Sequence, residues 1–260
     1  MDYRKLSKQP LQFVIAEFKF SPVLQIHKHI PDIQEAFRKK HPILDIKTDN
    51  VVQVTDNNTI KLESIERWSF ISSDRKEAIE LNQGRMIYFT SIYDRFDSFL
   101  SNCGDALKII EKTIKPSLIE RIGLRYSDLV LLDNNEKMES LINAHFKYPI
   151  EISDLGSIPQ QKTEIMIKTD KGQLAIRTLY GFDTWSYLFD LQNRLPISIQ
   201  MENIPSERMI LDFDHFWEAG DLTSNFKINN ILQILEGLHV IARDAFWKLT
   251  TDYARNEKWA

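Results

Sequence analysis

Apolar and polar positions in the first half of the chain predict strands and helices in alternation. A helix is predicted from Ile26 to Phe37, because apolar residues recur there every three or four positions and His41-Pro42 provides a stop. Residues rich in β-branched and aromatic side chains, bounded by turn-forming residues, predict strands on either side of this helix. These strand candidates are 11–20, 43–55, 59–72 and 86–90.

A second helix is predicted between the strand at 86–90 and Pro116. Asp94 has the position of an N-cap residue, and Asp97 lies in the first turn, where the helix dipole favours a carboxylate. The helix is followed by a strand candidate at 121–132. Its expected buried stripe consists of Phe96, Phe99, Leu100, Cys103, Leu107, Ile110 and Ile114.

The second half predicts further strands and then one long terminal helix. The strand candidates are 162–168, 174–180, 188–192, 197–201 and 209–216. The helix is predicted over 227–258, and its apolar positions alternate spacings of three and four. Ala242 and Ala245 in this heptad-like seam allow a partner surface to approach closely.

These elements predict an α+β protein with an antiparallel sheet in two halves. The halves are residues 1–133 and 134–260, with the helices packed on one side and the long C-terminal helix spanning both. Glycines and prolines are few and scattered, at 8 and 9 residues. Because no flexible linker separates the halves, we expect one compact unit.

Composition and charge narrow the function. The chain has 260 residues, and 33 Lys and Arg against 37 Asp and Glu give a net charge of −4, which disfavours a polybasic nucleic-acid or membrane-binding protein. The single cysteine, Cys103, excludes a disulfide framework within the chain and is typical of a reducing compartment. No apolar stretch approaches the roughly 18 residues that cross a bilayer, and residues 1–10 do not resemble a secretory signal. We therefore expect a cytoplasmic protein without a membrane partner.

Motifs for common enzyme chemistry are absent from the sequence. It contains no glycine-rich phosphate loop, zincin motif, nucleophile elbow or EF-hand spacing. A metal site needs three or four converging ligands, and His27-Lys28-His29 places a cation between two imidazoles. We therefore predict no cofactor, no metal and no catalytic residue.

Two carboxylates at 212 and 214 form one candidate site. In a strand, Asp212 and Asp214 point to one face, while Leu211, Phe213 and His215 point to the other. Two carboxylates roughly 7 Å apart can hold a divalent cation or share acid and base roles. The favoured interpretation is a polar strand face whose carboxylates pair with neighbouring Arg or Lys.

The most unusual segment is Arg121-Ile-Gly-Leu-Arg-Tyr126. In an extended chain, Arg121, Gly123 and Arg125 share one face and Tyr126 lies on the other. Two guanidinium groups then flank a position without a side chain, which leaves room for an anion, a carboxylate or another chain's backbone. The alternative is two structural ion pairs, with Asp212 and Asp214 if the strands are neighbours. The predicted ligand-binding residues are Arg121, Arg125, Tyr126, Asp212 and Asp214.

Motifs along nearly the whole chain resemble a known family. They are Trp68-Ser-Phe70, Phe96-Asp-Ser-Phe99, Arg121-Ile-Gly-Leu-Arg-Tyr126, Leu211-Asp-Phe-Asp214 and Leu238-His239. In this order they resemble a sporadically distributed family of uncharacterised bacterial proteins of about this length. The resemblance implies a bacterial cytoplasmic protein and a defence or toxin–antitoxin setting, and it brings no catalytic residues.

Three functional hypotheses follow. The first is a non-enzymatic binding or regulatory module for protein recognition or homodimerisation, based on the seam of the last helix and the aromatic-rich run at 181–187. The second is an enzyme of unfamiliar type that uses Arg121, Arg125, Asp212 and Asp214 in one pocket. The third is nucleic-acid binding by residues 1–40, which hold 8 Lys and Arg against 4 Asp and Glu. The third is disfavoured because aromatic and basic residues do not interleave there.

Overall fold

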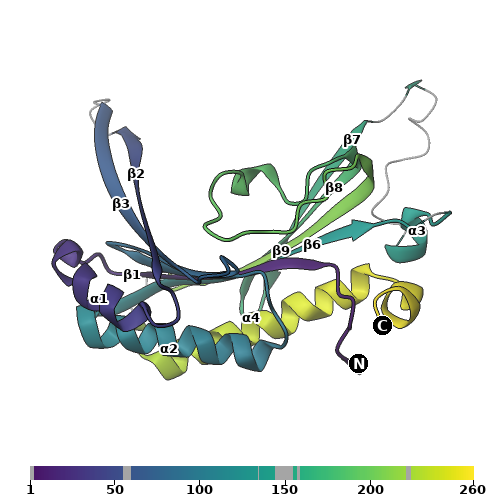
Figure 1. The fold of residues 1–260 in the computed structure, drawn as a ribbon. Helices are drawn as coiled ribbons and strands as arrows, with labels where there is room; N and C mark the ends of the chain where they lie inside the picture. Colours follow the sequence, from purple (N-terminus) through teal and green to yellow (C-terminus); the bar gives the residue numbers. More distant parts are fainter. Residues whose placement is uncertain (1–2, 55–59, 134, 144–154, 157–158, 221–223) are drawn as a thin grey trace.

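One antiparallel sheet forms the centre of the molecule (Figure 1). The computed structural model describes residues 3–54, 60–133, 135–143, 155–156, 159–220 and 224–260. Ten strands of these residues join the sheet: β1 (Leu11–Phe20), β2 (Ile43–Val54), β3 (Ile60–Ile71), β4 (Glu77–Asn82), β5 (Arg85–Thr90), β6 (Leu118–Leu131), β7 (Gln160–Thr169), β8 (Gly172–Asp183), β9 (Ser206–Glu218) and β10 (Ser224–Asn225). Their order is β2-β3-β4-β5-β1-β6-β9-β8-β7, and β10 pairs with β6.

The sheet is continuous across both predicted halves. β6 belongs to the first half and pairs with β9 of the second, with Arg125 opposite Asp214. β1 lies between β5 and β6, so the first strand of the chain is central. The α+β class predicted from the sequence is confirmed. Residues 55–59, where the strands predicted at 43–55 and 59–72 meet, lie outside the described residues.

The main helices cover one face of the sheet (Figure 1). The helical segments are η1 (Ile26–His29), α1 (Ile30–Phe37), α2 (Phe96–Ile114), α3 (Met138–Leu141), η4 (Phe189–Leu191), α4 (Ile228–Leu249) and the π-helical turn η5 (Ala254–Lys258). The stripe predicted for α2 packs into the core, and Lys115 in a left-handed conformation ends that helix before Pro116. The predicted N-cap is wrong: Arg95 has the cap position without a side-chain cap hydrogen bond, and Asp94 pairs with Lys5.

The terminal helix is shorter than predicted and is already packed. α4 ends at Leu249 because Thr250 turns into an extended conformation and bridges to Ile142. The Arg255 side chain donates hydrogen bonds to the carbonyl oxygens of Trp247 and Thr250. The apolar seam contacts the protein's own sheet, so it is not a free partner surface: Ile231, Leu235, Leu238, Ala242, Ala245 and Leu249 are buried.

Residues 184–205, here called the 184–205 loop, lie on the face of the sheet opposite the helices (Figure 1). The sequence predicted strands at 188–192 and 197–201, and both predictions are wrong. The first contains the 3-10 turn η4, and the second is irregular chain whose Ile197 packs on Phe13 and Phe89. Met86 and Tyr88 meet the helices while Phe89 meets this loop, so β5 is covered on both faces.

A fully buried arginine fixes the end of this loop. Arg208 on β9 is 0% exposed and donates to the carbonyl oxygens of Trp185 and Glu202 at 3.2 Å and of Ile204 at 2.6 Å. The planar guanidinium group therefore satisfies carbonyl groups that the loop buries without regular structure. Within the aromatic-rich run at 181–187, this contact holds Trp185, which is 9% exposed, whereas Phe182 is 69% exposed. None of the helices in the described residues has the length and apolar character needed to cross a bilayer.

Candidate functional site

The position above Gly123 is filled by the protein's own side chains. A Cβ atom added at Gly123 would lie 3.1 Å from Nη1 of Arg121 and 3.7 Å from Cβ of Glu17. Arg121 forms an ion pair with Glu17, and its guanidinium carbon lies 4.3 Å from the ring centre of Phe216. The vacancy expected between the two guanidinium groups is therefore wrong, because Arg121 bends back over the glycine to meet Glu17.

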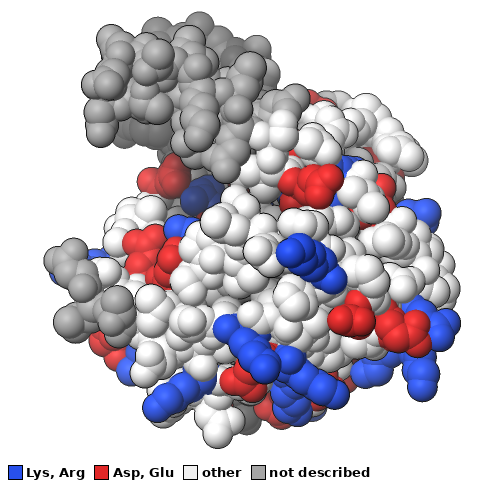
Figure 2. All heavy atoms as spheres, turned by 90° about the vertical axis from the view of Figure 1, so that its left-hand side faces the viewer, with Lys and Arg blue, Asp and Glu red and all other residues white. Residues whose placement is uncertain are grey.

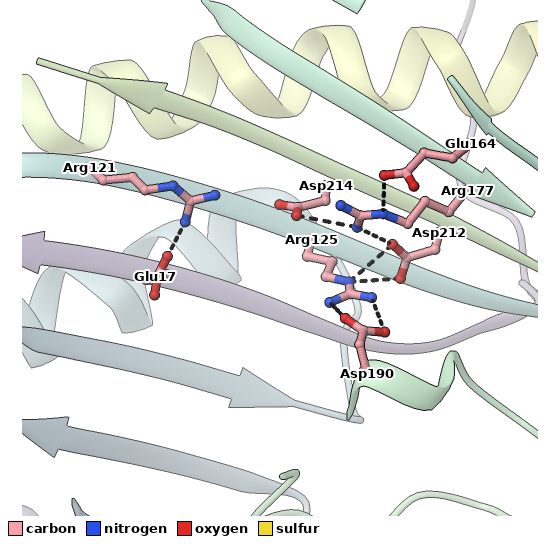
Figure 3. A network of polar contacts seen from close by, with 8 residues as sticks. All are labelled: Glu17, Arg121, Arg125, Glu164, Arg177, Asp190, Asp212 and Asp214. Carbon is pink, nitrogen blue, oxygen red and sulfur yellow. Dashed lines mark hydrogen bonds and ion pairs between the residues drawn. The ribbon is translucent and has the colours of Figure 1, made fainter. Parts of the chain in front are cut away.

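Arg125 lies at the centre of a separate ion-pair network (Figure 3). Its Nε donates to both carboxylate oxygens of Asp212 at 2.8 and 3.0 Å, and its terminal nitrogens donate to Asp190 at 2.7 and 3.1 Å. Burial opposes the charge of Arg125, but the carboxylates of Asp212 and Asp190 outweigh that cost and raise its pKa. Because Asp190 belongs to the 184–205 loop, Arg125 anchors this loop to the sheet.

Arg177 on β8 completes this network (Figure 3). It contacts Asp212 at 3.3 Å, Asp214 at 3.4 Å and Glu164 at 3.0 Å. Burial raises the pKa of Asp212 to about 6, although the charge of Arg125 opposes that shift. The structure thus brings Asp212, Asp214 and Arg125 together as ion pairs, as the favoured interpretation expected. Arg121 is not part of this cluster, so the four side chains do not converge on one catalytic pocket.

Tyr126 lies on the other face of the sheet, as the alternation of the strand predicted. Its hydroxyl group shares a hydrogen bond of 2.8 Å with Nδ1 of His239 on α4. The imidazole ring of His239 stacks on Phe96, with ring centres 3.9 Å apart and planes at 5°. Burial and the nearby charge of Arg243 lower the pKa of His239 to about 4, so this histidine is neutral at pH 7.

A cavity of about 330 Å³ lies beside this pair. It is enclosed by the N-terminal segment 3–11, the start of α2, β6, β9 and α4. Its volume is at the lower end of the range for small-molecule sites in proteins. The aromatic side chains that line it are Tyr3, Tyr93, Phe96, Tyr126, Phe213, Phe246 and Trp247.

Asp128 is the most unusual polar group of this cavity. It lines the cavity and is 4% exposed, and its carboxyl group forms no hydrogen bond or ion pair with any residue that the structure describes. Burial, assisted by the charge of Asp212, raises the pKa of its carboxyl group to about 8. A buried carboxyl group without a partner costs free energy, so its retention needs an explanation.

Sequence reasoning missed Asp128 although a signal was present. Ile122, Leu124 and Tyr126 alternate along β6 on the face that packs on the helices, and Asp128 is the next residue of that series. An acidic residue at an apolar position of a strand is a candidate for function. The prediction stopped at Tyr126, so it included the tyrosine of the cavity and omitted the acid two positions later.

The cationic side chains around the cavity have other partners. Lys5 pairs with Asp94, and Arg4 donates to the carbonyl oxygen of Arg255 at 2.9 Å. Arg243 lies over the ring of Tyr3 with its guanidinium carbon 3.8 Å from the ring centre. The Nε atom of Arg243 is buried without a hydrogen-bond partner in the described residues. Two buried groups of the cavity wall thus have no partner among the described residues, the carboxyl of Asp128 and one nitrogen of Arg243.

Other candidate groups have structural surroundings. Cys103 is fully buried in the core, where burial raises the pKa of its thiol. His215 is buried between Thr169 and the carbonyl oxygen of Leu238, with hydrogen bonds of 2.9 Å to each. Among the described residues, no three His, Cys, Asp or Glu side chains lie close enough together to hold a metal ion.

The surface at the α1 end carries charges of both signs. Figure 2 shows this side of the molecule, where Lys and Arg side chains alternate with Asp and Glu over short distances. Arg38 on this end forms an ion pair with Glu35. The positive excess of residues 1–40 is thus divided by acidic groups and does not form a broad single-sign patch in this view, which gives no support to nucleic-acid binding.

No family model matches the chain, and no curated protein matches its sequence. The resemblance to a sporadically distributed bacterial family therefore stays a prediction that rests on the quoted motifs, above all Arg121-Ile-Gly-Leu-Arg-Tyr126.

Proposed function

We propose that this protein is a non-enzymatic binding module whose ligand enters the cavity beside Asp128. The observation that carries this proposal is a buried carboxyl group with no partner in the described residues, at the wall of a cavity of about 330 Å³. A concave site that combines aromatic side chains with a few convergent polar groups is typical of small-molecule binding. The Tyr126 hydroxyl and the His239 imidazole are further polar groups at the same place.

The test is a fragment screen by NMR on the isotope-labelled full chain. The fragments cover cationic, neutral and anionic aromatic compounds of one size. Binding is expected to shift the resonances of β6 and α4 residues around the cavity, and the variant Val240→Trp should weaken it, because Val240 is 40% exposed and lines the opening. A matched control is Tyr253→Trp, which adds an indole at a position 46% exposed and away from the cavity lining. If no fragment binds, or if Val240→Trp binds as well as the control, the proposal fails.

A second candidate function is protein recognition at the β7 edge of the sheet. β7 is the last strand in the sheet order, and its consecutive residues Ile165, Met166 and Ile167 are 39, 52 and 40% exposed. Edge strands with apolar side chains on both faces pair readily with strands of another chain. This edge replaces the helix seam as the surface that supports the recognition hypothesis.

The form of recognition to be tested first is self-association through β7. Sedimentation equilibrium over a concentration series should detect a dimer, and the variant Ile167→Lys should shift the protein towards monomer. Leu24→Lys, at an exposed apolar position outside β7, is the matched control. A chain that is monomeric at all concentrations would remove self-association at this edge.

We place the protein in the bacterial cytoplasm as part of this proposal. The support is the single cysteine and the resemblance of its motifs to a bacterial family. A defence or toxin–antitoxin setting rests on that resemblance alone. Fractionation of cells that produce the full chain from its own promoter tests the location, because recovery outside the cytoplasm would contradict it.

A further inference from the structure

We infer that the cavity binds an organic cation with N–H donors, and that Asp128 is its counter-ion. This inference rests on the proposed function and adds the chemical class of the ligand. Asp128 is acceptor-only when ionised, so a ligand that completes its hydrogen bonding must donate. Within the described residues, no protein donor takes that position.

The walls of the cavity favour the same class of ligand. The rings of Tyr93, Phe96, Tyr126, Phe213 and Trp247 line the cavity, and the face of an aromatic ring carries negative quadrupole charge. A cation close to the face of such a ring is attracted by this charge, and the attraction is stronger when the cation is removed from water. A buried carboxyl group among aromatic rings therefore provides both interactions that an ammonium or amidinium ion needs.

The charged groups of the protein around Asp128 do not neutralise its carboxylate. The only charged group that shifts its pKa is Asp212 on the opposite face of β9, and that influence is repulsive. From α4, His239 is neutral and Arg243 lies over Tyr3 beside Asp244. From the N-terminal segment and the start of α2, Lys5 pairs with Asp94. Tyr93 and Tyr126 are uncharged because burial raises the pKa of each hydroxyl group. The other titratable groups on the cavity wall are Tyr3, Arg4, Arg95, Asp97 and Glu236.

Proton linkage makes the inference quantitative. Without ligand the carboxyl group of Asp128, with a pKa of about 8, is mostly protonated at pH 7. A bound cation favours the ionised form, so each binding event releases a proton at neutral pH. The affinity for a permanently protonated amine should rise about tenfold from pH 6 to pH 7 and about fivefold from pH 7 to pH 8.

The experiment compares three probes of equal size: benzylamine, benzyl alcohol and benzoate. Their dissociation constants are measured by NMR titration of the full chain at pH 6, 7 and 8. Benzylamine should bind most tightly, with the pH dependence given above. Asp128→Asn should weaken benzylamine binding by about thirtyfold at pH 8 and remove its pH dependence. Asp105→Asn, an equal change of net charge on the exposed face of α2, should change its dissociation constant less than twofold.

Each other outcome overturns the inference in a distinguishable way. Binding of benzyl alcohol or benzoate in the cavity, without benzylamine, would keep the proposed function and refute the cation; benzoate in particular would point to the free nitrogen of Arg243. Benzylamine binding that is equal in Asp128→Asn and the wild type would refute the counter-ion. Absence of binding by all three probes and by the wider fragment set would refute the proposed function as well. Folding of Asp128→Asn is verified by its NMR spectrum, and the pH dependence of the wild type tests the inference without any substitution.

Discussion

Asp128 and Asp212 lie on the neighbouring strands β6 and β9 and point to opposite faces of the sheet, and the charge of Asp212 raises the pKa of Asp128. Asp212 belongs to the ion-pair network that anchors the 184–205 loop, while Asp128 lines the cavity under α4. The two faces of one sheet are therefore linked by electrostatics, although no side chain passes between them.

Removal of the Asp212 charge should lower the pKa of Asp128. In Asp212→Asn, burial still holds this pKa above the ordinary value of 3.8, because burial is the larger cause of the shift. The measurement is a pH titration of the side-chain carboxyl carbon of Asp128 by NMR. Asp214→Asn is the matched control, since Asp214 is not among the causes of the shift. An equal change in both variants would contradict a direct influence of Asp212.

Asp128 should make the free energy of unfolding fall as the pH rises. Its pKa is about 8 in the folded protein and near 3.8 when unfolded, so the folded state holds an extra proton between these values. The stability that this proton contributes is fully present below the lower pKa and is lost as the pH rises towards 8. The free energy of unfolding of Asp128→Asn, measured relative to that of the wild type, should rise by about 2 kcal/mol between pH 6 and pH 7.5. Urea unfolding at both values measures this, and a constant difference would show that Asp128 has an ordinary pKa.

His239 should have the opposite dependence. Its pKa falls from an ordinary 6.5 to about 4 in the folded protein, so its contribution to stability is present above pH 6.5 and is lost as the pH falls towards 4. The free energy of unfolding of the wild type, measured relative to that of His239→Gln, should fall by about 2 kcal/mol when the pH is lowered from 7 to 5. His27→Gln, at an exposed position, is the control. Between pH 4 and 6.5 the effects of His239 and Asp128 on the pH dependence of stability cancel in the wild type. On folding, His239 releases a proton and Asp128 takes one up.

Substitutions at Arg125 and at Asp190 should lower the free energy of unfolding by very different amounts. Arg125→Met leaves the fully buried Asp212 with a weaker partner at 3.3 Å, and we expect a loss of about 3 kcal/mol. Asp190→Ala removes a carboxylate whose side chain is 56% exposed, and we expect at most about 1 kcal/mol. Urea unfolding measures both, and equal losses would contradict this assignment.

Hydrogen exchange separates anchoring of the loop from general stability. Asp190→Ala should accelerate amide exchange in the 184–205 loop and leave β1 and β6 unchanged, because it removes the ion pair that joins this loop to Arg125 on the sheet. Asp170→Ala, which removes an exposed ion pair in the turn between β7 and β8, should leave the loop as it is in the wild type. Unchanged exchange in the loop of Asp190→Ala would show that the ion pair with Arg125 does not anchor the loop.

Local patterns determined most of the elements of this protein. Period-two and period-3.6 patterns are properties of neighbouring residues, so they placed β1, α2 and β9 and identified the two faces of β6. The same patterns failed where distant contacts decide the conformation. The carbonyl groups of the 184–205 loop are satisfied by Arg208, and the end of α4 is set by Thr250 pairing with Ile142.

The candidate site divides in the same way. Alternation along β6 and β9 determined that Arg125, Asp212 and Asp214 share a face, and opposite charges on adjacent strands pair. Only the tertiary structure decided that Arg121 turns to Glu17 on β1, because strand order is not encoded in any local pattern. It also decided that Asp128 is buried without a partner, since its environment consists of the N-terminal segment, α2 and α4, which are distant in sequence and meet only when the sheet is assembled.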